Sequence, residues 1–268
     1  MSRSKLDRLK LLSYNIQAGI RTSRYREYIT RGWRQVLPYS RRHANLDSIA
    51  GLSSDYDIVA LQEADAGSLR SGFLDQTRYL AEQAGFVFHY HQSNRKVGKI
   101  AHAGNALLAR WQPARVHEHR LPGAIPGRGA LSAHFGEGDQ QLMIMVVHLA
   151  LGSRARERQL AYIRRRVASH RDLIVMGDFN TTMSSAALRD FIDASGLREP
   201  QEVLHTFPAW DPRRGIDHIL VGGDIEVERF EVVDVDYSDH RPLAMQIHLP
   251  WAITVDTHRE PVIEAALP

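Results

Sequence analysis

Residues 173–180, with the sequence LIVMGDFN, form an apolar stretch that ends in side chains able to do chemistry. Because side chains alternate along a strand, an extended backbone would place Asp178 and Asn180 on the same side. Gly177 would let the backbone approach a ligand closely. The carboxylate and amide oxygens would suit a hard cation, or a phosphate group held beside one. A polar turn after a core strand would contain the same residues, so both interpretations stay open from this stretch alone.

Six further short motifs accompany this stretch in a fixed order. They are LSYNI at 12–16, VALQE at 59–63, GNALLAR at 104–110, VVHL at 146–149, IDHIL at 216–220 and SDHRPL at 238–243. With GDFN after the fourth, the series resembles the endonuclease/exonuclease/phosphatase superfamily, which includes deoxyribonuclease I, abasic-site endonucleases, neutral sphingomyelinases and inositol polyphosphate 5-phosphatases. The resemblance covers residues 9–249. A single motif of this length is weakly specific, whereas seven in order are strongly so.

The resemblance implies a metal site built from oxygen ligands. Glu63 matches the metal-binding glutamate of the family, and a carboxylate at the end of an apolar strand is costly to leave without a partner. Asn15 matches an asparagine of the metal and phosphate site, and Asp239 and Asp178 would complete the set. The expected cofactor is Mg²⁺ or Mn²⁺, as one ion or two, because residue identities do not settle the number.

The same resemblance implies catalytic roles for polar residues near strand ends. His148 matches a histidine of deoxyribonuclease I and the sphingomyelinases that contacts the scissile phosphate, where abasic-site endonucleases generally have tyrosine. Asp217 would orient His240, which would take a proton from the attacking water, and Asp178 is the rival base. Asn180 and His148 would bind the non-bridging oxygens, where charge develops in the transition state.

The positive charge of the chain is concentrated in one segment. The formal net charge is +3, but residues 20–42 contain seven arginines and one acid, a balance of +6, which leaves −3 for the rest. Aromatic residues interleave with these arginines, a mixture that suits nucleic-acid phosphates with base stacking, or an anionic membrane surface. The alternative is a solvated helix face. The expected substrate contacts are Arg24, Arg26, Arg31, Arg34 and, from GNALLAR, Asn105.

Strand and helix patterns alternate along the chain and would position these side chains. Helices are expected at 44–52, 76–84, 153–170 and 185–194, and strands at 9–16, 58–62, 86–91, 114–120, 130–135, 142–148, 216–221, 227–235 and 243–249, with a loop at 92–102. His218 would point to the opposite face from Asp217, which favours a structural role. The alternation predicts a mixed α/β (α+β) domain. The resemblance implies a four-layer α/β/β/α sandwich, two mixed β-sheets packed face to face with helices outside.

The chain is expected to form one catalytic domain over residues 1–250, followed by a loose C-terminal tail at 251–268. The chain contains no run of 18 apolar residues, so no transmembrane segment is predicted, and the N-terminus lacks the pattern of a signal peptide. The absence of cysteine excludes disulfides and thiolate metal sites. We therefore expect a cytoplasmic monomer.

The sequence favours a metal-dependent hydrolase of phosphoester bonds. It contains no GxxxxGK[ST] loop, Gly-rich dinucleotide turn or Ser-centred nucleophile elbow, which excludes several other enzyme classes. The preferred activity is a phosphodiesterase that cleaves nucleic acid by attack of water at phosphorus. The alternative is a sphingomyelinase-like enzyme for a phospholipid, or one for a soluble phosphate ester. A non-catalytic binding module should lack Glu63, Asp178 or His240, and none is missing.

Overall fold

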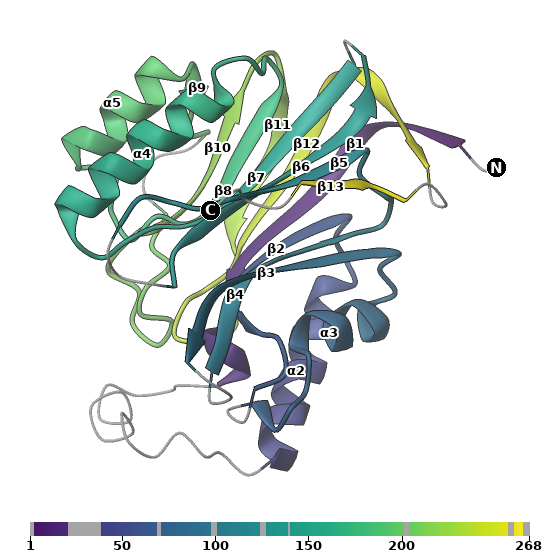
Figure 1. The fold of residues 1–268 in the computed structure, drawn as a ribbon, viewed down its shortest axis with the longest axis vertical. Helices are drawn as coiled ribbons and strands as arrows, with labels where there is room; N and C mark the ends of the chain where they lie inside the picture. Colours follow the sequence, from purple (N-terminus) through teal and green to yellow (C-terminus); the bar gives the residue numbers. More distant parts are fainter. Residues whose placement is uncertain are drawn as a thin grey trace.

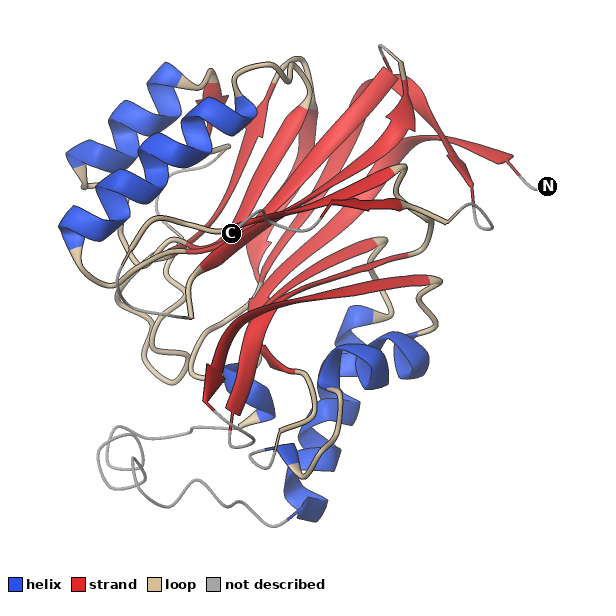
Figure 2. Ribbon diagram, in the orientation of Figure 1, coloured by secondary structure: helices blue, strands red, loops and turns tan. Residues whose placement is uncertain are grey.

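Two mixed β-sheets pack face to face in the computed structural model of the chain, and helices cover both outer sides (Figure 1). Figure 2 shows the red strands between two separate groups of blue helices. The structure describes residues 3–20, 39–68, 71–97, 101–123, 127–138, 140–200, 204–256 and 260–264. The four-layer α/β/β/α sandwich predicted from the sequence is therefore confirmed.

The first sheet has six strands in the order β11-β12-β1-β2-β4-β3. Their bounds are β1 Arg3–Asn15, β2 Ile58–Asp65, β3 Phe88–Val97, β4 Ala101–Ala109, β11 Glu226–Val232 and β12 Leu243–Asp256. β1 and β2 run parallel, and the other neighbours are antiparallel. The carboxyl ends of β1 and β2 and the amino end of β12 therefore lie at the same edge.

The second sheet has seven strands in the order β13-β5-β6-β7-β8-β10-β9. Their bounds are β5 Arg115–His119, β6 Gly129–Glu137, β7 Gln140–His148, β8 Leu173–Asp178, β9 Leu197–Arg198, β10 Asp217–Gly222 and β13 Val262–Glu264. β7 runs parallel to β8, and β10 is antiparallel to β8. This sheet thus also brings two carboxyl ends and one amino end to a common edge.

Three hydrophobic clusters fill the spaces between the four layers. Between the sheets, residues such as Leu11 of β1 and Phe135 of β6 are fully buried. On the first sheet lie α2 (Tyr39–Ser53) and α3 (Gln76–Ala84), and on the second lie α4 (Ser153–Val167) and α5 (Ala186–Ala194). The α3 helix ends as predicted at Gly85, whose φ of 72° suits a residue without a Cβ atom. A short 3-10 helix, η1 (Gln17–Gly19), follows β1.

Two predictions about local structure are wrong. Most of the loop expected at 92–102 is a hairpin arm, because β3 extends to Val97 and β4 begins at Ala101. The tail expected from residue 251 is partly ordered: 251–256 complete β12, and β13 pairs in parallel with β5. Ile253 and Val255 alternate along β12 and are buried between the sheets, which explains why the strand continues past Pro250.

The arginine-rich segment falls almost entirely outside the described residues. Residues 21–38 are not described, and these include Arg24, Arg26, Arg31 and Arg34, so their contact with substrate stays a prediction. Arg42 is described in α2 and is only 5% exposed, so this arginine does not belong to a solvated face. None of the described helices has both the length and the apolar character needed to cross a bilayer.

Candidate active site

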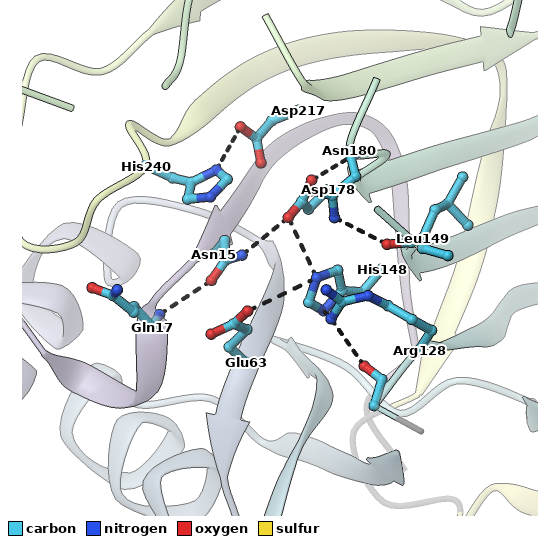
Figure 3. A network of polar contacts seen from close by, with 12 residues as sticks. Asn15, Gln17, Glu63, Arg128, His148, Leu149, Asp178, Asn180, Asp217 and His240 are labelled. Atoms are coloured by element: carbon cyan, nitrogen blue, oxygen red, sulfur yellow. Dashed lines mark hydrogen bonds and ion pairs between the residues drawn. The ribbon is translucent and has the colours of Figure 1, made fainter. Parts of the chain in front are cut away.

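Polar side chains from both sheets converge at one end of the sandwich (Figure 3). They come from the carboxyl ends of parallel strands and from the amino ends of their antiparallel neighbours, and they are Asn15, Glu63, His148, Asp178, Asp217 and His240. The sheets are linked at this point, because Asn15 Nδ2 donates to Asp178 Oδ2 at 3.2 Å. The topology therefore brings together the residues that the sequence motifs single out.

Backbone irregularities aim Glu63 and also Asn180, which follows Asp178 by two residues. The pairing of β2 with β4 shifts register between Leu61 and Ala64, which places Glu63 in a bulge with a φ of 59°. Asn180, just after β8, has a φ of 52°. A left-handed conformation costs a non-glycine residue roughly 1–3 kcal/mol, so the surrounding fold must hold both in place. Such strain is most often found at functional positions.

Asp178 is the centre of the cluster and is 2% exposed. Its Oδ1 atom accepts the backbone N–H of Asn180 at 2.8 Å, in addition to the bond from Asn15 to Oδ2. Burial, reinforced by the nearby charge of Asp217, raises the pKa of Asp178 to about 7, although His240 acts in the opposite direction. A carboxyl group with that pKa can exchange a proton near neutral pH.

Gly177 has a different role from the one the sequence suggested. A Cβ atom at this position would lie 2.0 Å from the carbonyl oxygen of Val147 on β7. Its φ of 144° is also unfavourable for other residues. The absence of a side chain therefore permits close approach of the β7 backbone to β8, and this contact, with no ligand involved, already requires glycine.

His240 and Asp217 form a buried pair, as predicted. His240 Nδ1 lies 2.9 Å from Asp217 Oδ2, which also accepts a 2.5 Å hydrogen bond from the hydroxyl of Thr206. Burial alone would lower the pKa of His240, but the charge of Asp217 and the hydrogen bond between His240 and Asp217 raise it to about 10, with contributions from nearby Asp178 and Asp239. In this charge environment, His240 carries a proton at neutral pH.

His218 points away from that pair, also as predicted. Its Nδ1 atom lies 2.6 Å from a carboxylate oxygen of Glu199, and its Nε2 atom lies 2.8 Å from the carbonyl oxygen of Thr181. Both ring nitrogens are occupied, which fits a structural role.

His148 is neutral and has a defined tautomer. Burial, with the positive charges of Arg128 and His240, lowers its pKa well below the usual value. Arg128 Nη1 lies 3.3 Å from Nδ1, and because a guanidinium can only donate, Nδ1 is the acceptor. Nε2 therefore carries the hydrogen, and it lies 3.4 Å from Asp178 Oδ2 and 3.9 Å from Glu63 Oε1.

Arg128, which contacts this cluster through His148, was not identified from the sequence. It lies at the start of β6 between two glycines, and this Gly-Arg-Gly sequence is its only local signal. The backbone that directly follows Arg128 is held from the other sheet: Asn105 Nδ2 donates to the carbonyl oxygen of Gly129 at 2.9 Å, and Gln92 Nε2 donates to that of Ala130 at 2.7 Å.

Asn105 therefore differs from the expectation that it contacts substrate. It is fully buried, and Nδ2 also donates to Gln92 Oε1 at 3.3 Å. Its hydrogen bonds link the two sheets and support the segment that carries Arg128. The physical reason is its position on β4, which directs the side chain toward the β6 backbone.

The residues at this end fit a hard cation. Burial raises the pKa of Asp239, and the nearby charge of Glu63 adds to this, while His240 opposes it. In the described residues, ligand atoms of Asp178, Asp217 and His240 lie within 4.8 Å of one another, a buried cluster that could hold a metal ion. Asp217 Oδ2 is already engaged, so Glu63, Asp178 and Asp239 are the carboxylates more suited to an ion.

Comparison with known proteins places this geometry in context. The model of the endonuclease/exonuclease/phosphatase family matches residues 12–240. No curated protein matches the chain.

Solved structures share the fold at low sequence identity. The mannosyl-6-phosphatase of Bacteroides thetaiotaomicron VPI-5482 is 19% identical, with a TM-score of 0.67 over 89% of this chain and 99% of that chain. The catalytic domain of human Nocturnin, with a bound sulfate anion, is 18% identical, with a TM-score of 0.67 over 92% of this chain and 96% of that chain. A humanized TDP2 of D. rerio is 16% identical, with a TM-score of 0.64 over 91% and 100%.

Proposed function

We propose that this chain, which belongs to the endonuclease/exonuclease/phosphatase family, is a metal-dependent phosphodiesterase that cleaves nucleic acid by attack of water at phosphorus. The observation that carries the proposal is the position of Asp178. This carboxylate lies beside the neutral His148 on one side and the protonated His240 on the other. A proton acceptor and two donors thus surround one point at which a phosphate could sit.

The metal-binding role falls to Glu63, Asp239, Asn15 and Asp178. Their oxygens are hard ligands, and the buried carboxylates of Asp178 and Asp239 lie with the half-buried Glu63 where a positive charge would offset them. Mg²⁺ or Mn²⁺ bound here would neutralise the phosphate and stabilise the departing oxygen.

The proton-transfer roles follow from the charges of the side chains. The sequence favours His240 as the base, but the charge of Asp217 outweighs burial and raises the pKa of this histidine, which makes it a better proton donor than acceptor. Asp178 is the better base, since its ionised form, favoured next to a cation, accepts a proton from water. His240, held by Asp217, would instead donate a hydrogen bond to the phosphate.

Two further donors would hold the non-bridging oxygens. His148 Nε2–H points into the cluster, and Arg128 supports it from behind. Asn180 uses one amide hydrogen for the carbonyl oxygen of Leu149 at 2.9 Å, which leaves the second for a phosphate oxygen. Such fixed donors stabilise charge that develops in the transition state.

A soluble phosphate ester is the second candidate substrate. The likeness to a mannosyl-6-phosphatase supports it, because the same end of the same fold is available to a small substrate. Nucleic acid is preferred because of the arginine-rich composition of residues 20–42.

A substrate panel tests the proposal. Plasmid DNA, single-stranded DNA, RNA, sugar phosphates and phospholipid vesicles would be incubated with Mg²⁺ or Mn²⁺, with and without EDTA, using Asp178→Asn as the inactive control. We expect nucleic-acid cleavage that stops with EDTA and returns with added metal. Cleavage of sugar phosphates or lipids alone would overturn the assignment of nucleic acid as the substrate. Full activity in EDTA would overturn the proposed metal dependence.

A further inference from the structure

A cavity of about 230 Å³ lies near the candidate active site, on the outer face of the second sheet. One wall is the loop that follows β8, with Thr182 and Ser184, and the opposite wall is the segment that leads into β10, with Arg214. His218 contributes to the lining and pairs in register with Gly177, the neighbour of Asp178. The strands that carry the reacting groups thus also form part of this cavity.

Phe207 connects the cavity with the catalytic pair. Its ring centroid lies 4.9 Å from that of His240. The guanidinium carbon of Arg214 lies 6.0 Å from the same ring centroid. Arg214 and His240 are therefore separated by a single aromatic side chain, and a substrate bound at His240 could extend to Arg214.

The positive charges in the cavity wall are only partly compensated. Glu199, the one acid among the described lining residues, is paired with His218, and Arg213 pairs with Asp211 at 2.6 Å. Arg214 has no carboxylate partner within the part of the chain that the structure describes. An arginine without a counter-ion beside a cavity favours an anionic ligand.

A second arginine adds to this positive potential. Arg156, in the first turn of α4, donates to the backbone carbonyl groups of Ala150 and Leu151. Burial lowers its pKa, and the positive charge of Arg214 acts in the same direction, although Glu157 opposes it. Arg156, which does not itself line the cavity, and Arg214 are thus close enough for their like charges to interact.

We propose that this cavity binds a phosphate group of the substrate other than the one that is hydrolysed. Arg214 provides the main charge. The hydroxyl groups of Thr182 and Ser184 lie 2.7 Å apart, and because only one hydrogen serves that bond, the pair has another to donate. The cavity of about 230 Å³ has room for a phosphate with part of the group attached to it.

The inference rests on the proposed function and narrows the substrate to esters that carry at least two phosphate groups. A nucleic-acid strand and a small bisphosphate both have this chemistry. Two experiments distinguish phosphate binding in the cavity from catalytic activity. They also distinguish a nucleic-acid substrate from a small bisphosphate.

The first experiment measures binding without turnover. Inorganic phosphate would be titrated into the full chain in EDTA by calorimetry, because the carboxylate cluster without metal repels anions. We expect Arg214→Ala to raise the Kd about 10-fold, the scale of a lost charge-assisted hydrogen bond, and Arg214→Lys to recover part of the affinity. The matched control, Arg158→Ala, removes an exposed arginine from α4 and should bind like the parent. Equal affinity in Arg214→Ala and the parent would overturn the site.

The second experiment measures the ratio of kcat/KM between substrates with and without an additional phosphate. One pair is a dinucleotide with and without a 5′-terminal phosphate, and the other is a sugar bisphosphate and its monophosphate. Arg214→Ala should lower this ratio about 10-fold for the pair of compounds that resembles the natural substrate. An unchanged ratio in both pairs would contradict the inference. If neither the parent nor any variant hydrolyses any substrate, the proposed function fails. The phosphate titration still decides whether the cavity binds phosphate.

Discussion

His148 and Asp178 are direct register partners at the ends of parallel strands β7 and β8, and His148 Nε2 lies 3.4 Å from Asp178 Oδ2. On the other side of β8, Asp217 of β10 is the register partner of Asp178. Three adjacent strands thus present a neutral imidazole, a carboxyl group with a raised pKa and the carboxylate that holds His240. This row of side chains suggests how the charges in the cluster can be tested.

Glu63 is expected to determine the affinity for metal. Glu63→Ala removes one formal charge from a hard-cation site, so the Mg²⁺ concentration needed for half-maximal activity should rise. Activity would be measured over a Mg²⁺ titration. Glu82→Ala is the control, since it removes an exposed carboxylate of α3 that pairs with Arg78. Identical titration curves for Glu63→Ala and the parent would assign the ligand role to other residues.

The pair of Asp217 and His240 is expected to act as one unit. Each single alanine variant should lower kcat by about 10²-fold or more, the scale for loss of a positioned hydrogen-bond donor to charge that develops in the transition state. The double variant should be little worse than His240→Ala alone, because Asp217 acts through the imidazole. Steady-state kinetics of the three variants would show this. Losses that multiply would mean that Asp217 contributes independently.

Asn105 is expected to act through Arg128. Asn105→Ala leaves the carbonyl oxygen of Gly129 without one donor, so the free energy of unfolding should fall by about 1–3 kcal/mol. Catalysis should fall as well, because the support of Arg128 is weakened. A double-mutant cycle with Arg128→Ala separates the two effects: the losses in kcat should be less than multiplicative. Multiplicative losses would mean that Asn105 contributes to stability and does not act on catalysis through Arg128.

Two histidines on the second sheet are expected to make stability depend on pH. Burial lowers the pKa of His119 to about 3 and of His134 to about 4, and neighbouring His117 adds to both shifts. The unfolded chain, with a histidine pKa near 6.5, binds more protons, so this stabilisation is complete above about pH 6.5 and is lost as the pH falls toward the folded values.

The raised pKa values in the candidate active site act in the opposite direction, so the informative quantity is a difference between variants. The free energy of unfolding would be measured in urea at pH 7 and pH 5 for the parent and for His119→Gln. The parent should lose more stability than the variant between these pH values. An equal loss would show that His119 is not buried in its neutral form.

The sequence by itself determined the alternation of strands and helices, and its family resemblance implied the four layers and the identity of most of the cluster. Apolar runs with period two or 3.6 specify which face of a strand or helix is buried, and that information is local. Asn15 and Glu63 stand at the ends of such runs, so their common location follows once β1 and β2 run parallel. Asp178 lies in the second sheet and joins them because the two sheets pack face to face. The helix end at Gly85 is also local, because a left-handed residue needs no distant partner.

Tertiary structure decided the features that depend on which strands become neighbours. Gly177 is required by the carbonyl group of Val147, and the orientation of Glu63 comes from a bulge against β4. Arg128 joins the cluster because residues of the first sheet hold the β6 backbone. These contacts join segments far apart in the chain, and no local pattern encodes such a contact, because each partner alone is compatible with many neighbours.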